Sequence, residues 1–134
     1  MPTLQSMAQA NPPVPVLMPE RATEIELSAE IEELRDHAEW KEGVARKTLL
    51  QHPGFQITLR MMRAQACIPK HSNPGRVSVQ PLFGKLRMRA NGQNFDLTPG
   101  KLLVLDQSVQ HDVEALEDSA FLLTVSEPVD ARQD

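Results

Sequence analysis

From residue 43 onward, apolar and polar residues alternate with a period of two. The segments FQITLRMM and KLRMRANG both follow this alternation, which is typical of strands with one buried face. Pro-Gly pairs at 53–54, 74–75 and 99–100, and Asn-Gly at 91–92, separate such segments as turns. Roughly eight short strands with no helix among them predict an all-β sandwich or barrel over about residues 43–126. The alternation predicts buried side chains at Val77, Val79, Leu86, Met88, Val104 and Leu123, and exposed ones at Lys85, Arg87 and Arg89.

The segment before the strands has a different pattern. Residues 23–40 contain no glycine or proline, and Ile31, Leu34 and Ala38 follow one another at helical spacing. We expect one short helix over about residues 25–40, with Ser28 as its N-cap and a solvated His37. Five of the eleven prolines fall within the first nineteen residues, so residues 1–20 are expected to form a flexible arm. The arm is either a free tail or a segment that packs on a partner subunit, and the rest, residues 21–134, forms one domain.

Composition narrows the possible class of protein. Hydrophobic residues make up 40% of the chain and charged residues 24%, as in soluble globular proteins. The longest apolar runs fall short of a membrane span, the N-terminus does not resemble a signal peptide, and one cysteine cannot form an internal disulfide. We therefore expect a cytoplasmic protein with no membrane partner.

Charge is unevenly distributed along the chain. Residues 1–42 carry nine acids and three bases, residues 43–101 ten bases and one acid, and residues 102–134 eight acids and one base. The basic middle lacks the interleaved aromatic residues of a nucleic-acid stacking surface. We expect no nucleic-acid partner and interpret the pattern as acidic and basic segments that lie side by side in the fold.

In the first candidate motif, between residues 65 and 84, His71 stands thirteen positions before Gly84, and this spacing resembles that of the cupin family. The first cupin motif runs glycine, five residues, His-x-His, three or four residues, glutamate, six residues, glycine. His71 matches the first histidine and Gly84 the closing glycine. The opening glycine, the second histidine and the glutamate are replaced here by Gln65, Asn73 and Val77.

The second cupin motif matches residues 100–115 in the same partial way. It runs glycine, five residues, Pro-x-Gly-x-x-His, three residues, asparagine. Gly100 and His111 match, whereas Asp106, Ser108 and Ala115 replace the proline, the second glycine and the asparagine. The chain thus resembles small single-domain cupins of the RmlC-like jelly-roll type, with degenerate metal motifs. This resemblance implies a double-stranded β-helix, here with an N-terminal arm and one short helix.

The resemblance also implies a site inside the barrel. Cupins hold iron, manganese, nickel or zinc on three histidines and a carboxylate, but the matching positions here offer His71, Asn73, Val77 and His111. An amide is a poor ligand for these metals and valine is none, so His71 and His111 are the candidate metal ligands. Gln80 could join them only if a bulge at Pro74-Gly75 turned it inward. Three interpretations stay open: a metal site, a polar pocket without an obligatory metal, and two structural histidines.

Other reactive residues suggest little. Cys67 stands four positions before His71, so both could share a face as a nucleophile pair, although a small buried hydrophobic residue is the simpler interpretation. His52 precedes a Pro-Gly turn and is expected at the surface.

The expected function is binding of a small polar ligand in the barrel cavity, with the metal not obligatory. The candidate ligand-binding residues are His71, Asn73, His111, Met61 and Val77. The alternative is a metal-dependent cupin enzyme of the dioxygenase, isomerase or decarboxylase type with a reduced ligand set. The resemblance to small cupins also implies self-association, so a homodimer is expected.

Overall fold

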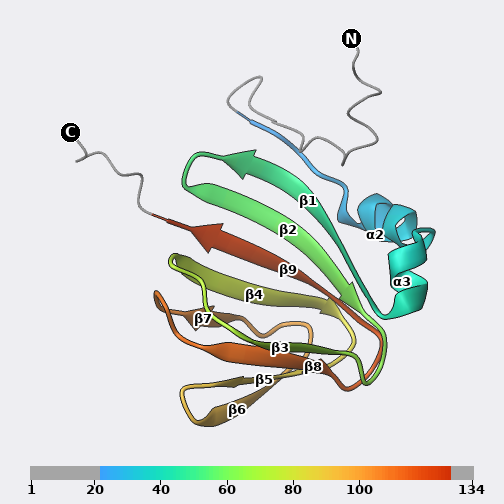
Figure 1. Ribbon diagram of the computed structural model, residues 1–134. Helices are drawn as coiled ribbons and strands as arrows, with labels where there is room; N and C mark the ends of the chain where they lie inside the picture. The colour runs from blue at the N-terminus through green and yellow to red at the C-terminus, as the bar shows by residue number, and fades with distance from the viewer. Residues whose placement is uncertain (1–21, 128–134) are drawn as a thin grey trace.

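Two antiparallel β-sheets form the body of the molecule. The computed structural model describes residues 22–127, so the expected arm at residues 1–20 lies outside the described part, as do residues 128–134 (Figure 1). The five-stranded sheet has the order β1-β2-β9-β4-β7 and the four-stranded sheet the order β3-β8-β5-β6. The elements are α2 (Leu27–Arg35), α3 (Ala38–Glu42), β1 (Val44–His52), β2 (Phe55–Met62), β3 (Cys67–His71), β4 (Arg76–Phe83), β5 (Leu86–Ala90), β6 (Gln93–Leu97), β7 (Leu103–Leu105), β8 (His111–Ala115) and β9 (Ser119–Ser126).

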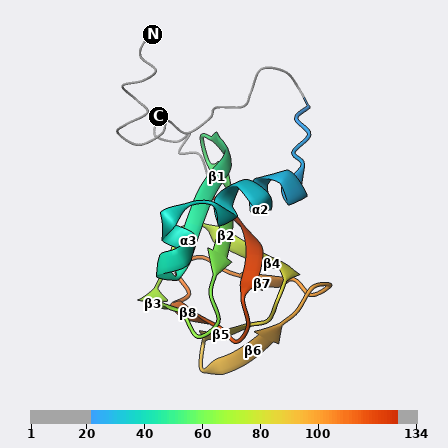
Figure 2. The ribbon, with the colours of Figure 1, turned by 90° about the vertical axis from the view of Figure 1, so that its right-hand side faces the viewer.

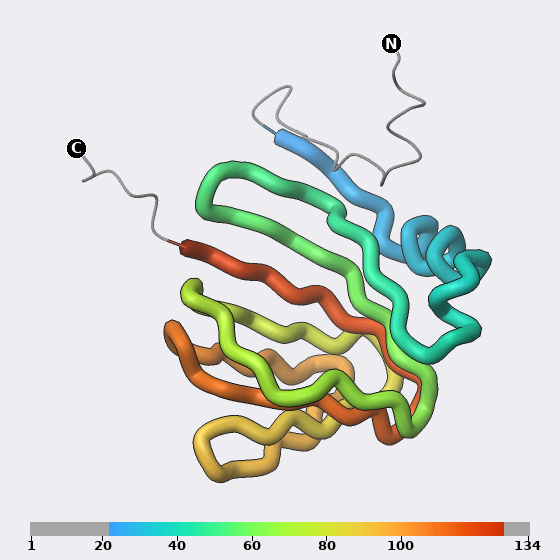
Figure 3. The backbone as a smooth tube through the Cα atoms, in the orientation of Figure 1, coloured from blue at the N-terminus to red at the C-terminus, as the bar shows by residue number. Residues whose placement is uncertain are grey.

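The chain moves between the sheets as it proceeds. It leaves the five-stranded sheet after β2, forms β3 in the other sheet, and returns for β4 (Figure 3). Strands distant in sequence therefore become neighbours, as β3 pairs with β8 and β2 with β9. This arrangement places the two motif segments, which the sequence separates, on adjacent strands.

The five-stranded sheet is covered on both faces. Its inner face, which looks toward the four-stranded sheet, contributes Val77, Val79 and Phe121 to a core shared with Leu86 and Met88. Its other face, the helix-covered face, packs against α2 and α3, which lie over β1 and β2 (Figure 2). The second core contains Leu34, Trp40, Ala45, Leu49, Leu59, Met61 and Ala120.

The helical segment differs from the single helix expected over residues 25–40. Two short helices form instead, and the chain breaks between them at Asp36 and His37. Helix α2 has Glu26 at its N-cap position without a side-chain cap, so the Ser28 cap is wrong. The break lets Leu34 and Trp40 both reach the same core. No helix within residues 22–127 is long and apolar enough to cross a membrane.

The predicted core residues are largely confirmed. Val77, Val79, Leu86 and Met88 are buried, Leu123 is partly buried against the same cluster, and Arg89 is exposed. Val104 is a correction, because its side chain is 60% exposed. Strand β7 lies at the edge of its sheet and pairs only with β4, so alternation there puts Leu103 and Leu105 inward instead. Lys85 and Arg87 are half-buried rather than fully exposed.

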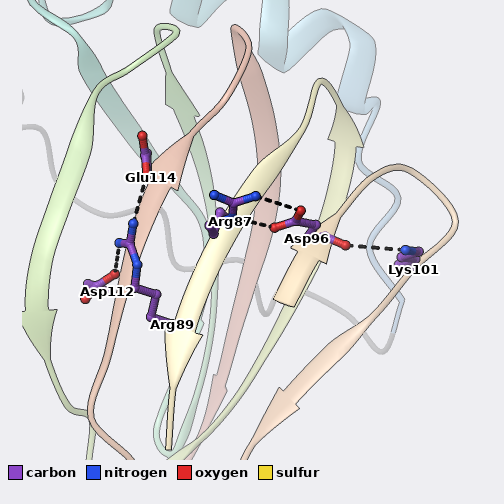
Figure 4. Close-up of polar contacts among 6 residues, drawn as sticks. All are labelled: Arg87, Arg89, Asp96, Lys101, Asp112 and Glu114. Carbon is purple, nitrogen blue, oxygen red and sulfur yellow. Dashed lines mark hydrogen bonds and ion pairs between the residues drawn. The ribbon is translucent and has the colours of Figure 1, made fainter. Parts of the chain in front are cut away.

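The acidic and basic segments do lie side by side. Lys47 of β1 pairs with Glu30 and Glu33 of α2, and Arg76 pairs with Asp106. On the outer face of the four-stranded sheet, charged side chains of neighbouring strands form a ladder (Figure 4). Its pairs are Arg89 with Asp112 and Glu114, and Arg87 with Asp96, whose carbonyl also accepts from Lys101. These ion pairs offset part of the local charge imbalance in the sequence.

The four glycine positions of the two cupin motifs share a backbone feature. Gly84 and Gly100 have φ angles of +88° and +101°. Gln65 and Ser108, which stand where the motifs have glycine, also have positive φ, +76° and +62°. A side chain with a Cβ is strained in this region. Gln65 and Ser108 therefore have the left-handed backbone that glycine adopts most easily, although both carry a Cβ.

This strain is testable by restoring glycine. Gln65→Gly and Ser108→Gly should each raise the free energy of unfolding by roughly 0.5–1 kcal/mol, because relief of left-handed strain outweighs the added freedom of the unfolded chain. Urea unfolding would measure the change. Gln80→Gly is the matched control: Gln80 is exposed in the middle of β4, and glycine there should destabilise by roughly 0.5–1 kcal/mol. A loss of stability at positions 65 and 108 equal to that of the control would contradict the argument.

Candidate functional site

The two motif histidines lie directly opposite each other on β3 and β8. The pairing runs Cys67 with Glu114 and Ile68 with Val113, then shifts so that His71 pairs with His111. The shift is a bulge at Pro69 and Lys70, where two residues of β3 face one residue of β8. Strict alternation from Ile68, which packs in the core, would turn His71 outward, and the bulge turns it inward again.

The two imidazole rings are in contact. Their centroids lie 4.3 Å apart with planes at 61°, an edge-to-face arrangement. The two candidate metal ligands therefore lie together, but their place differs from the internal barrel cavity that the sequence analysis expects. His111 is only 4% exposed and sits beside the core, whereas His71 is exposed, so the pair lies at the rim of the barrel rather than in an enclosed cavity.

Backbone carbonyls fix the tautomer of each ring. His71 Nδ1 lies 2.9 Å from the carbonyl oxygen of Pro69, and His111 Nδ1 lies 3.0 Å from that of Val109. A carbonyl oxygen can only accept, so each Nδ1 carries the proton and donates. Each neutral ring therefore keeps an Nε2 lone pair that can accept a hydrogen bond or coordinate a metal. The site offers two such acceptors at close range.

The surroundings of His111 disfavour its charged form. Burial lowers the pKa of His111, and positive charge on His71 and on Arg60 acts in the same direction. The hydrogen bond to Val109 and the carboxylate of Asp112 oppose the shift without reversing it. His111 is thus held as a neutral acceptor at pH values where a solvated histidine begins to protonate.

Arg60 is a residue that the sequence analysis missed. It lies on the inner face of β2, since it pairs directly with Phe121 of β9, a member of the inner core. The polar set of Gln56, Thr58 and Arg60 alternates with the apolar face of the same strand, and alternation alone suggests that polar residues face solvent. The helices make the apolar face a second core, and this leaves the polar face inside the barrel. The sequence held one indication of this arrangement. An amphipathic helical segment precedes the strands, and a strand that such helices cover on its apolar face has to turn its polar residues inward.

The other predicted ligand-binding residues have different positions. Met61 is a correction: it is fully buried on the helix-covered face and cannot line the barrel. Val77 is buried in the inner core, as expected for an inward residue. Asn73 lies in the loop after β3, where its side-chain oxygen accepts from Gly75 N at 2.9 Å and its carbonyl accepts from Ser108 N at 2.8 Å. Its role is therefore to shape and join the two motif loops. Gln80 is exposed, so it does not turn inward as an additional ligand. The bulge of this segment lies at Pro69 and Lys70, not at the Pro74-Gly75 turn where it would have been needed.

Cys67 and His71 do not form a pair. Cys67 is exposed and, because of the bulge, faces the opposite side of β3, so both earlier interpretations of this cysteine are wrong. His37 is exposed, as expected, and His52 is half-buried. His52 lines a hollow of about 480 Å³ at the β1–β2 turn. A second hollow, of about 710 Å³, includes Lys70 and Asp112, and neither hollow is lined by the histidine pair.

The donor set does not fit a tightly held transition metal. Among residues 22–127, no three His, Cys, Asp or Glu side chains come together in a way that could hold an ion. His71 and His111 supply two nitrogen ligands, and the nearby charge of Arg60 disfavours a cation. Catalytic metal sites commonly use three protein ligands.

Comparisons with known proteins bear on the fold. No protein-family profile matches the chain, and no curated protein matches it. Similar solved structures include a conserved protein of unknown function from Streptococcus pyogenes (24% identity, TM-score 0.65, 81% of this chain and 90% of that one). A cupin superfamily protein from Desulfitobacterium hafniense is 17% identical with a TM-score of 0.66, over 81% of this chain and 94% of that one. Salicylate 1,2-dioxygenase from Pseudoaminobacter salicylatoxidans is 14% identical with a TM-score of 0.71, over 81% of this chain but only 34% of the dioxygenase.

The two sheets and these structural likenesses together define the fold. The chain has the cupin fold, a jelly-roll barrel preceded by short helices, which confirms the expected fold class. At these low identities the likeness concerns the fold alone. Function has to be argued from the residues at the rim.

The lowered pKa of His111 predicts a pH dependence of stability. Below about pH 6.5 the unfolded chain gains a proton at this residue before the folded chain does, so the free energy of unfolding falls as pH drops. Urea unfolding between about pH 5 and pH 8 should show a shallower fall in His111→Asn than in the unsubstituted protein. Gln110→Asn is the control, because it changes an exposed residue next to His111 without removing a titratable group, and its slope should equal that of the unsubstituted protein. An unchanged slope in His111→Asn would contradict the assignment.

Proposed function

We propose that this chain binds a small polar molecule at the rim of its barrel, at the His71–His111 pair, and needs no resident metal to do so. The observation that carries the proposal is the pair of contacting imidazoles whose Nδ1 protons are both engaged by backbone carbonyls. Two neighbouring acceptors, one buried and one exposed, suit a ligand that enters from solvent and donates hydrogen bonds. The homodimer expected from the sequence also remains a proposal.

The local fold supports a preformed site. The bulge in β3 sets the direction of His71, and Pro69 supplies the carbonyl that orients its ring. Across the pair, Ser108 N donates to the carbonyl of Asn73, which ties the loops that flank both histidines. Little rearrangement is then needed on binding, and a preorganised site keeps more of its interaction energy.

A metal-dependent enzyme is the second candidate. The two free Nε2 lone pairs favour it, since neutral imidazole is a common metal ligand. The absence of a third His, Cys, Asp or Glu ligand within residues 22–127 weighs against it. The dioxygenase among the similar structures supports an enzymatic role only by analogy of fold, because one fold carries many activities.

The binding proposal is testable with a panel of small polar molecules. Ligand-observed NMR with sugars, amino acids, organic acids and phosphate esters should find at least one class that binds the unsubstituted protein. His71→Ala and His111→Asn should each weaken that binding by about tenfold or more, because each removes one acceptor from the pair. His37→Ala, a change at the exposed N-cap position of α3, should leave it unaltered. If binding occurs but neither rim substitution affects it, the site is placed wrongly.

Whether the protein holds a transition metal can be tested separately. We expect protein purified without an affinity tag to lose any bound transition metal on dialysis against a chelator, because two nitrogen ligands hold an ion weakly. Elemental analysis before and after dialysis measures the metal, and circular dichroism with thermal unfolding measures the fold, which should be unchanged. A stoichiometric metal that survives dialysis, or unfolding on its removal, would favour the second candidate.

A further inference from the structure

A polar hollow lies where the outer face of the four-stranded sheet meets the β5–β6 turn. Its volume is about 710 Å³, within the range of roughly 300–1,000 Å³ that is usual for small-molecule sites. Lys70 of β3, Asp112 of β8 and Asn94 of β6 line it, together with residues of the turn and of the loop before β8. Segments distant in the sequence thus converge on one concave surface.

Charge in the hollow is balanced. Arg89 lies between Asp112 and Asn94 in the sheet, since it pairs directly with both. Its guanidinium bonds to Asp112 at 2.8 Å and to Glu114 at 3.0 Å (Figure 4). With Lys70, two cations therefore stand against two carboxylates, and no net charge favours an anion or a cation as ligand.

Side-chain amides supply most of the remaining polar groups. Each amide offers N–H donors and a carbonyl acceptor, and the amides of the lining are exposed, so both are within reach of a ligand. These residues are Asn91, Gln93, Asn94 and Gln110. Among the lining residues only Ala90 and Val109 bring apolar side chains, and none is aromatic. An apolar ligand would gain little here, whereas a ligand with many hydroxyl groups would find donors and acceptors in the same place.

The walls of the hollow are held by the backbone. The β5–β6 turn is formed by Asn91 and Gly92, whose φ angles of +53° and +76° are typical of a tight hairpin turn. In the loop before β8, Ser108 N donates to the carbonyl of Asn73 at 2.8 Å. A site that is formed before binding keeps more of its interaction energy.

We propose that this hollow binds a neutral, polyhydroxylated molecule of the size of a monosaccharide. Every hydroxyl group both donates and accepts, as the amides do, and the balanced charge of the hollow suits a ligand without charge. The inference goes beyond the proposed function, because neither His71 nor His111 lines the hollow and the ligand needs no contact with them. Because no aromatic ring is available for stacking, we expect a dissociation constant on the order of 1 mM or weaker.

The experiment titrates the full chain with D-glucose, D-galactose and myo-inositol, and follows the side-chain amide signals by two-dimensional NMR. We expect at least one of these probes to shift the signals of Asn94 and Gln110 saturably. Cyclohexanol, a six-membered ring with a single hydroxyl group, should leave them unmoved, because one hydroxyl group cannot engage several amides. D-Glucuronate should bind no more tightly than D-glucose, because the charge of the hollow is balanced.

Two substitutions test the placement of the ligand. Asn94→Ala and Gln110→Ala should each weaken binding of that probe by about threefold to tenfold, because each removes donors and an acceptor from the hollow. Both side chains are exposed, so the midpoint of thermal unfolding should stay unchanged. Gln80→Ala is the matched control, at an exposed glutamine of β4 in the other sheet, and it should bind as the unsubstituted protein does.

The outcomes distinguish this inference from the proposed function. If none of the three neutral probes shifts the amide signals, or if cyclohexanol shifts them equally, the assignment fails. Glucuronate binding that is about tenfold tighter than glucose binding would overturn the neutral ligand class. If His71→Ala and His111→Asn weaken binding of the probe and the two amide substitutions do not, the probe lies at the histidine pair, so the proposed function stands and this inference is wrong. Weaker binding in the two amide variants alone would support the hollow as a second site.

Discussion

The rim of this barrel depends on how β3 accommodates a proline. Pro69 has no backbone N–H to donate, and it lies in a strand at the edge of the four-stranded sheet, where a bulge is tolerated. The bulge returns His71 to the inner side of β3, level with His111. The carbonyl of the same proline then accepts the Nδ1 proton of His71 and fixes its tautomer. One local irregularity thus sets the position, the direction and the hydrogen-bonding capacity of one half of the site.

A second constraint comes from covering one sheet on both faces. The apolar side of β2 packs under α2 and α3, so the alternate residues of the strand have to face the other sheet whether or not they are apolar. Arg60 is one of these residues, and its Nε is buried without a hydrogen-bond partner. A buried donor without a partner is unfavourable, so the position of Arg60 follows from the covering of the sheet and not from a favourable contact of its own.

The sequence predicted the features that local pattern controls. Period-two alternation located the strands. The match to the two cupin motifs pointed to His71 and His111 as one site, and the two residues are indeed paired across β3 and β8. The errors concern features that no single strand determines. Met61 was assigned to the barrel because alternation defines two faces but does not say which of them the helices cover. For Val104 the alternation was taken in the wrong phase, because β7 is a short edge strand with few residues to set the phase. Cys67 was expected on the same side as His71, because a bulge between them has no fixed sequence signature.

Gln65 and Ser108 show that residues other than glycine can adopt a backbone conformation typical of glycine. Both have a left-handed backbone that glycine would adopt more easily. A comparison that scores residue identity loses two of its most informative positions, whereas a comparison of main-chain shape loses nothing. The same contrast holds for the whole chain, which matches no family profile and yet resembles solved cupin structures in fold. For such chains, backbone dihedral angles at motif positions carry information about the fold that residue identities do not.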